Sequence, residues 1–142
     1  MTYRIAAAAL LAMLATAPAA RADLYTLFIY ETADELAART DPQRAEAYWG
    51  AYAAYGKALA DAGVIRGGAA LTFGDAVRTL RQRDGAAAVV PGAATSGPEQ
   101  LGGYFVIEVA DLDTALGWAA RAPSALTGAV EVRPAYPAPA MR

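Results

Sequence analysis

The chain contains no cysteine and no histidine among its 142 residues. Without cysteine it forms no disulfide, offers no thiol nucleophile and provides no thiolate ligand for a metal ion. Without histidine it lacks the commonest general base near neutral pH and the commonest metal ligand. Its glycine pairs are not followed by the Lys-Ser/Thr of a phosphate-binding loop. The sequence therefore predicts no metal site and no cofactor, and leaves carboxylates, tyrosines and arginines as candidates for chemistry.

Charged side chains are also few, at 18% of the residues, and the formal net charge is −2. A nucleic-acid groove needs concentrated positive charge, so we expect no nucleic-acid partner. The hydrophobic fraction of 56% argues against disorder, and the length suits one domain with its own core.

Residues 1–22 have the three-part layout of a secretory signal peptide. An arginine precedes an apolar run that is too short for a membrane span of about 20 residues, and the segment ends in Ala-Arg-Ala. We expect cleavage between Ala22 and Asp23, a periplasmic or secreted protein, and no membrane attachment afterwards. The main alternative is a misassigned start codon and a cytoplasmic domain, and a further one is an uncleaved membrane anchor. The expected domain spans residues 23–134, and residues 135–142 form a proline-rich tail.

The first half of the predicted domain shows one strand and one long helix. Leu24 to Tyr30 is a dense apolar run that is typical of a buried strand, and residues 31–40 predict a loop or a short helical turn. Asp41-Pro42 and Gly63 are start and stop signals for the helix. One narrow face of this helix carries four large side chains, Tyr48, Tyr52, Tyr55 and Leu59. Such a stripe indicates core packing or, because tyrosine hydroxyls need partners, a face toward a cavity.

The second half alternates strands with one short helix. Asp84-Gly85 is a two-residue hairpin signal between two alternating segments. The segments expected to form strands or helix are, in order, strands at 64–73 (interrupted by Gly67-Gly68), 76–83, 86–90 and 104–109, a helix at 111–121 and a strand at 129–133.

This order predicts an α+β fold rather than a doubly wound parallel sheet, because helices are few and hairpins join the strands. It fits a ferredoxin-like sheet with two helices on one face. The strands at Leu24–Tyr30 and Tyr104–Val109 are apolar at nearly every position, so both faces of the sheet need cover. Face-to-face pairing of two copies is the simplest cover, and we expect a homodimer.

The C-terminal third carries three sequence motifs in succession. They are EQLGGY at Glu99–Tyr104, DLDTALGWA at Asp111–Ala119 and VEVRP at Val130–Pro134. In these motifs the chain resembles the YCII-related family, specifically its DGPF-domain branch. The resemblance extends over nearly all of Leu24 to Pro134, and it implies a dimeric ferredoxin-like α/β barrel.

The chain departs from that family at the positions expected for chemistry. The family's Asp-Gly-Pro-Phe element falls eight residues before the Glu-Gln pair, where this chain has Pro91-Gly92-Ala93-Ala94, so the acid and the aromatic ring are absent. The wider family is associated with a His–Asp pair, and this chain has no histidine. The resemblance therefore implies a member that lacks the usual catalytic groups.

Glu108 is the candidate acid or base, because it sits in an otherwise apolar strand on the same face as Tyr104. A carboxylate in apolar surroundings has a raised pKa, which suits it to proton transfer. The alternative is a strand-end carboxylate that is hydrated or is paired with an arginine such as Arg133.

Arg81 and Arg83 fall on one side of their predicted strand, where either guanidinium would bind a carboxylate or phosphate. The alternative is a solvated strand or one at a subunit edge. Together with Tyr52, Tyr104 and Glu108, these arginines make up the possible ligand pocket.

Three functions remain open from the sequence. One is a non-catalytic small-molecule-binding or accessory domain, whose ligand would be a small organic acid. Another is a lyase or isomerase acting on such an acid, and the third is a structural or regulatory dimer without a ligand.

Overall fold

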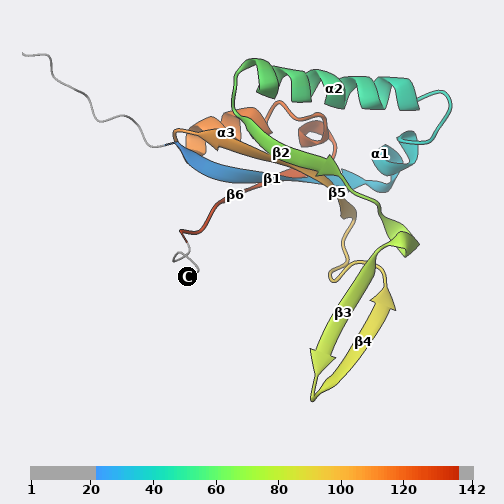
Figure 1. Ribbon diagram of the computed structural model, residues 1–142. Helices are drawn as coiled ribbons and strands as arrows, with labels where there is room; N and C mark the ends of the chain where they lie inside the picture. The colour runs from blue at the N-terminus through green and yellow to red at the C-terminus, as the bar shows by residue number, and fades with distance from the viewer. Residues whose placement is uncertain (1–21, 138–142) are drawn as a thin grey trace, which may run out of the picture.

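The computed structural model describes residues 22–137, which form a four-stranded antiparallel sheet, a layer of helices on one of its faces and a separate hairpin (Figure 1). The elements are, in order, β1 (Asp23–Thr32), α1 (Ala33–Ala38), α2 (Ala45–Asp61), β2 (Ile65–Ala70), η1 (Gly74–Ala76), β3 (Arg78–Arg83), β4 (Ala86–Pro91), β5 (Glu99–Val109), α3 (Leu112–Ala119), η2 (Pro123–Leu126) and β6 (Ala129–Pro134).

The strand order in the sheet is β2-β5-β1-β6, and every neighbouring pair is antiparallel. The two inner strands, β1 and β5, are the two apolar segments of the sequence. Each is followed by helical structure that returns the chain to an outer strand on the far side of the other inner strand. This is the ferredoxin-like α+β arrangement that the sequence predicts.

The core lies between the sheet and the helices. Side chains of β1 alternate between the two faces, so Tyr25, Leu27 and Ile29 point toward the helices and are buried. The other fully or largely buried members of this layer are Tyr55, Leu59, Ile107, Val109, Ala115, Ala119 and Ala122. Several are alanines with little area to bury, so much of the hydrophobic stabilisation comes from the larger residues.

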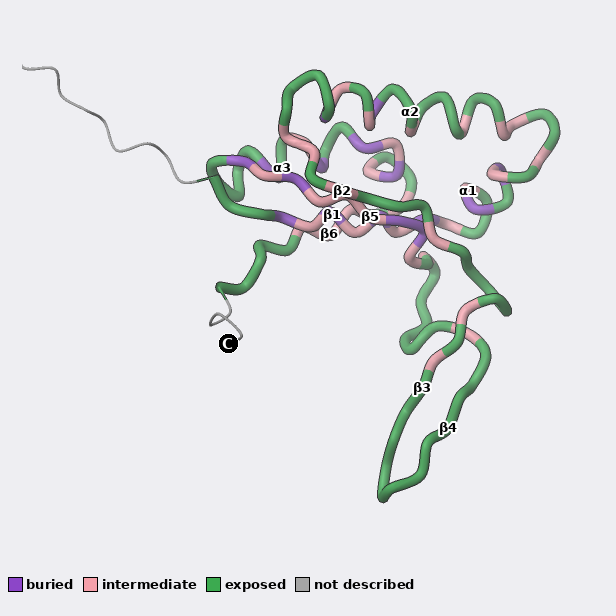
Figure 2. Tube along the Cα trace, in the orientation of Figure 1, coloured by how far each residue is buried: buried purple, intermediate pink, exposed green. Residues whose placement is uncertain are grey.

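The opposite face of the sheet has no layer over it among residues 22–137. Phe28, Tyr30 and Val106 lie on this face and are half-buried, and Leu24 is exposed. Figure 2 shows the exposed hairpin extending from the body of the protein. That hairpin, β3–β4, is a two-stranded sheet of its own and is not part of the main sheet.

Several element boundaries differ from the expectations. β1 continues two residues beyond Tyr30, so Glu31 belongs to the strand and not to the predicted loop. Within residues 31–40, where a loop or a short helical turn was expected, the structure has the six-residue helix α1. The long helix begins at Ala45, because Asp41 instead caps a turn by accepting a hydrogen bond from the backbone N–H of Gln43 at 2.8 Å.

Other local predictions are confirmed. Gly63 has φ +70° just after α2, and Asp84 and Gly85 both have positive φ, as a two-residue hairpin turn requires. Asp111 caps α3 by accepting a hydrogen bond from Thr114 N–H.

The predicted signal peptide falls on residues 1–21 and Ala22, and residues 1–21 lie outside the described part of the chain. Asp23, the residue after the predicted cleavage point, begins β1. Among residues 22–137, no helix has both the length and the apolar character needed to cross a membrane.

Candidate functional site

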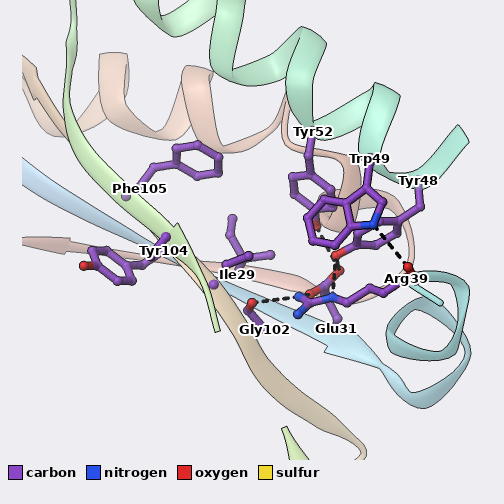
Figure 3. A pocket seen from close by; sticks show the side chains of 13 residues that line it. Ile29, Glu31, Arg39, Tyr48, Trp49, Tyr52, Gly102, Tyr104 and Phe105 are labelled. Carbon is purple, nitrogen blue, oxygen red and sulfur yellow. Dashed lines mark hydrogen bonds and ion pairs between the residues drawn. The ribbon is translucent and has the colours of Figure 1, made fainter. Parts of the chain in front are cut away.

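A cavity of about 220 Å³ lies between the N-terminal half of α2 and the sheet (Figure 3). Four residues form its polar wall. They are Glu31 in β1, Arg39 immediately after α1, and Tyr48 and Tyr52 in α2. The rest of the lining comes from Ile29, Trp49, residues 68–70 of β2 and residues 102–105 of β5.

Glu31 is the polar centre of this wall, and it is completely buried. The alternation that turns Leu27 and Ile29 toward the helices also turns Glu31 inward. Its Oε1 accepts hydrogen bonds from the hydroxyls of Tyr48 at 2.6 Å and Tyr52 at 3.2 Å, and its Oε2 is paired with Arg39. A buried carboxylate is tolerated only with such compensation.

Arg39 is the counter-charge, and its side chain is 8% exposed. Beyond Glu31, its guanidinium donates to Tyr48 Oη at 2.8 Å and to the carbonyl oxygens of Leu71 and Gly102, each at 2.7 Å. The guanidinium also lies 5.5 to 5.8 Å from the ring centroids of Tyr48, Trp49 and Phe73. Aromatic faces at this distance attract a cation, so the site holds Arg39 by several kinds of contact.

Helix α1 fixes the direction in which Arg39 leaves the backbone. Thr32 and Glu35 form a reciprocal capping box at its N-terminus, with Glu35 N–H donating to Thr32 Oγ1 and Thr32 N–H donating to Glu35 Oε2. Thr127 Oγ1 donates to the other carboxylate oxygen of Glu35. Leu36 is buried beneath the helix. These contacts join a six-residue helix to the body and position the arginine that follows it.

Gly102 is the position in β5 where the backbone comes closest to the ion pair. The register between β1 and β5 shifts at Ile29/Tyr30, which leaves Gly102 as the extra residue of a bulge. A Cβ at this position would overlap the Glu31 carboxylate and lie 2.6 Å from Arg39 Nη2. Glycine is therefore required for the carboxylate and guanidinium to meet.

The two tyrosine hydroxyls stay protonated well above neutral pH. Burial raises the pKa of Tyr48, and the adjacent Glu31 carboxylate raises it further. Burial is also the main cause that raises the pKa of Tyr52. Both phenols are therefore donors to Glu31. Ser124 is fully buried, and its Oγ makes no hydrogen bond within the described residues.

The aromatic stripe of α2 divides between cavity and core. Tyr48 and Tyr52 line the cavity, whereas Tyr55 and Leu59 are buried in the core. The Tyr55 hydroxyl donates to the backbone carbonyl of Trp118 at 3.0 Å. The interpretation as a cavity-facing stripe therefore applies to Tyr48 and Tyr52, and the interpretation as core packing applies to Tyr55 and Leu59.

Of the five residues predicted to form a ligand pocket, the cavity includes two. Tyr52 contributes its ring and hydroxyl, whereas Tyr104 contributes backbone, because its ring lies on the sheet face opposite the helices (Figure 3). Arg81 and Arg83 lie in the exposed hairpin, outside the cavity lining.

Glu108 also lies outside the cavity lining, on the uncovered face of the sheet. It forms an ion pair with Arg66 at 2.6 Å, and the two side chains are 34% and 44% exposed. The alternative interpretation named an arginine partner such as Arg133. That arginine instead pairs with Glu131.

Sequence reasoning did not identify Glu31, Arg39 or Trp49 as site residues, and it included Tyr48 only as part of the aromatic stripe that could face a cavity. One signal was available for Glu31. If the predicted strand is continued two residues beyond Ile29, its alternation of faces places the Glu31 side chain on the inward side. Arg39 carries no comparable local signal, since its partners lie on β1, α2, β5 and the segment after β2.

Within residues 22–137, no group of three or more Asp or Glu residues is arranged to hold a metal ion. The chemistry available in the cavity is therefore that of one ion pair, two phenols and an aromatic wall. Such a set is chemically suited to hydrogen bonds and ring contacts with a small molecule.

A search of curated proteins found no match. The family model of the YCII-related domain matches residues 23–138, from the first residue of β1 to beyond the end of β6. Because that match covers most of the 142 residues, the chain belongs to the YCII-related domain family.

Proposed function

We propose that this protein binds a small organic acid in the cavity beside α2 and does not transform it. The observation that carries the proposal is a cavity whose wall combines aromatic rings with a buried ion pair. Ligand sites in proteins are commonly apolar with a few placed polar groups. A cavity of about 150 Å³ accommodates benzene, so about 220 Å³ suits one substituted ring or a short aliphatic chain.

Arg39 supports an acid as the ligand. A guanidinium has five N–H donors, and the hydrogen bonds of Arg39 within the described residues use four of them. The remaining N–H belongs to Nη1, which is available to a carboxylate or carbonyl oxygen. A bond from a charged donor to a charged acceptor is stronger than a neutral one.

The same hydrogen bonds argue against catalysis. Glu31 Oε1 already accepts from both tyrosines, and Oε2 is held by Arg39. A carboxylate has about four lone-pair sites, and these bonds occupy three of them on Glu31. Both phenol protons are donated to Glu31, so none of these groups is directed at a substrate as a general acid or base must be. The network is arranged as a fixed wall, which supports binding over the lyase or isomerase alternative.

A thermal-shift screen with aromatic and aliphatic carboxylic acids and their amides tests the proposal. A ligand that binds only the folded state stabilises it by about 2.7 kcal/mol at 100 times its Kd, so hits will raise Tm in a concentration-dependent way. Acids should outperform their amides. Turnover of a hit, followed by mass spectrometry, would instead support the enzyme alternative.

Trp49→Ala is the informative variant for that screen. Trp49 lines the cavity but is 44% exposed, so its removal should alter the binding site while leaving the fold intact. Tyr136→Ala is the matched control, because that ring is 87% exposed and outside the cavity lining. The binding proposal fails if no acid raises Tm, or if Trp49→Ala responds to the hits as the wild type does.

We also propose that the protein acts outside the cytoplasm as a homodimer. The layout of residues 1–22 supports export, and mass spectrometry of the exported protein should find Asp23 as its first residue. An intact Met1, or no export, would contradict this. The half-buried Phe28 and Val106 on the uncovered sheet face support pairing of two copies through that face, because antiparallel sheets facing water are normally polar there.

A further inference from the structure

The β3–β4 hairpin has almost no support from the rest of the chain. It forms a separate two-stranded sheet, and every residue of β4 is exposed. Its hydrogen bonds beyond the strand ladder reach only the segments that flank it. Arg78 Nη1 donates to the carbonyls of Asp75 and Val77 before the hairpin. After the hairpin, Thr79 Oγ1 donates to the Gly92 carbonyl and Arg81 Nη2 to the Ala94 carbonyl. An isolated two-stranded hairpin is marginally stable in water, so another surface is expected to hold it.

Apolar side chains on the hairpin are exposed in register. Leu80 and Val89 are directly paired across the two strands and are 63% and 58% exposed. Val90, on the other face, is 45% exposed and is paired with Thr79. Cross-strand apolar pairs of this kind stabilise a sheet when a neighbouring surface covers them.

The charge of the hairpin is opposite to that of the body. Residues 78–91 contain three arginines and one aspartate, for a net charge of +2. The rest of residues 22–137 contains six basic and thirteen acidic side chains, for a net charge of −7. A second copy of this chain therefore presents the hairpin with a body of complementary charge.

The position of the hairpin allows it to reach such a copy. Figure 1 shows the helices on one side of the main sheet and the hairpin extending on the other, which is the side of the uncovered face. Packed sheets lie about 10 Å apart, whereas strands of six residues span about 20 Å. A copy packed on the uncovered face would thus lie alongside the hairpin.

We propose that β3–β4 is an arm that packs against the body of a second copy of this chain. The proposal rests on the pairing through the sheet face proposed above. In this arrangement Leu80 and Val89 contact the partner's surface. Arg81 and Arg83 lie on the opposite face of the arm, beside Thr79, and act through the positive charge that they give the arm rather than through direct contact. Two copies exchange their arms reciprocally, as a two-fold symmetric pair requires.

Sedimentation equilibrium of the mature chain tests the arm. We expect a dimer, and we expect Leu80→Lys and the double variant Arg81→Glu/Arg83→Glu each to raise the dimer Kd at least about tenfold. Leu116→Lys on α3 is the matched control, because Leu116 is 48% exposed in the helix layer, and it should change Kd by less than about twofold. All these side chains are exposed, so the monomer fold should persist.

Hydrogen exchange provides the second measurement. Amides of residues 78–91 should exchange slowly in the dimer and rapidly in Phe28→Glu, which places a charge on the uncovered face and separates the copies. If both arm variants keep the wild-type Kd while Phe28→Glu is monomeric, the proposed arm contact is wrong and the proposed pairing through the sheet face is supported. A wild type that is monomeric at about 100 μM, far above the Kd of a specific complex, overturns both.

Discussion

Glu31 and Arg39 form a buried ion pair, with side-chain exposures of 0% and 8%. Eight residues separate them, at the end of β1 and just after α1. Desolvating two charges costs several kcal/mol per ion, and their mutual attraction offsets this only when the remaining hydrogen-bonding groups are also satisfied. Tyr48, Tyr52 and the carbonyl of Gly102 supply those bonds.

Removal of either charge should therefore destabilise the folded protein strongly. Glu31→Gln leaves Arg39 buried without its counter-charge, and we expect the free energy of unfolding to fall by about 3–5 kcal/mol. Urea denaturation measures this. The control is Asp61→Asn, which breaks the exposed Lys57–Asp61 pair and should cost no more than about 0.5 kcal/mol. Equal losses in the two variants would show that the buried pair has no special role in stability.

Gly102→Ala tests the close approach of the β5 backbone to the pair. The added Cβ would overlap the Glu31 carboxylate, so we expect a loss of at least about 3 kcal/mol or failure to fold. Gly117→Ala is the control, because a Cβ there meets no atom within 4 Å in α3. It should stabilise the helix by about 0.5–1 kcal/mol. Soluble expression and Tm of the two variants report the difference.

The two tyrosines that donate to Glu31 should differ in importance. Tyr48 Oη donates to Glu31 and accepts from Arg39, both at short distance, whereas Tyr52 donates only a 3.2 Å bond. Bonds to charged groups contribute about 1.5–3 kcal/mol, so Tyr48→Phe should destabilise the protein more than Tyr52→Phe. Urea midpoints of the two variants, compared at constant m-value, check this order. The reverse order would contradict it.

Stability should decrease at alkaline pH because of the buried phenols. Burial raises the pKa of Tyr55 from about 10 to about 12. Below pH 10 both states keep the proton, so the full stabilisation is present. Between pH 10 and 12 the unfolded state loses the proton first, and stability falls by about 1.4 kcal/mol per pH unit for this tyrosine.

Tyr55→Phe should remove that part of the slope, which urea denaturation at intervals between pH 9 and pH 12 would reveal. Tyr136→Phe is the control, since its ring is 87% exposed and leaves the core intact. An unchanged slope in Tyr55→Phe would mean that the Tyr55 phenol does not drive the alkaline loss of stability.

Local sequence signals were sufficient for most of the fold. The apolar runs predicted β1 and β5, Asp84-Gly85 predicted the hairpin turn, and Asp111 predicted the cap of α3. Each depends on residues close together in sequence, where backbone preference and periodicity decide the outcome. The motifs of the C-terminal third also indicated the family, which the match over residues 23–138 confirms.

The site was predicted less well than the fold. Glu108 stands out in the sequence because its neighbours are apolar, yet alternation places it on the opposite face from the cavity. Arg81 and Arg83 share a strand face as predicted, but that strand is in the hairpin and not in the main sheet. The local pattern shows which side chains of a strand share a face. Which helix, cavity or solvent that face contacts depends on the whole fold.

The sequence by itself determined which segments form strands and helices, where the chain turns, and the family. Only the tertiary structure decided that Glu31, Arg39, Tyr48 and Gly102 meet beside one cavity. The reason is physical: the cost of burying a charge is offset by partners distant in sequence, and their distances are set only when β1, β5 and α2 pack together.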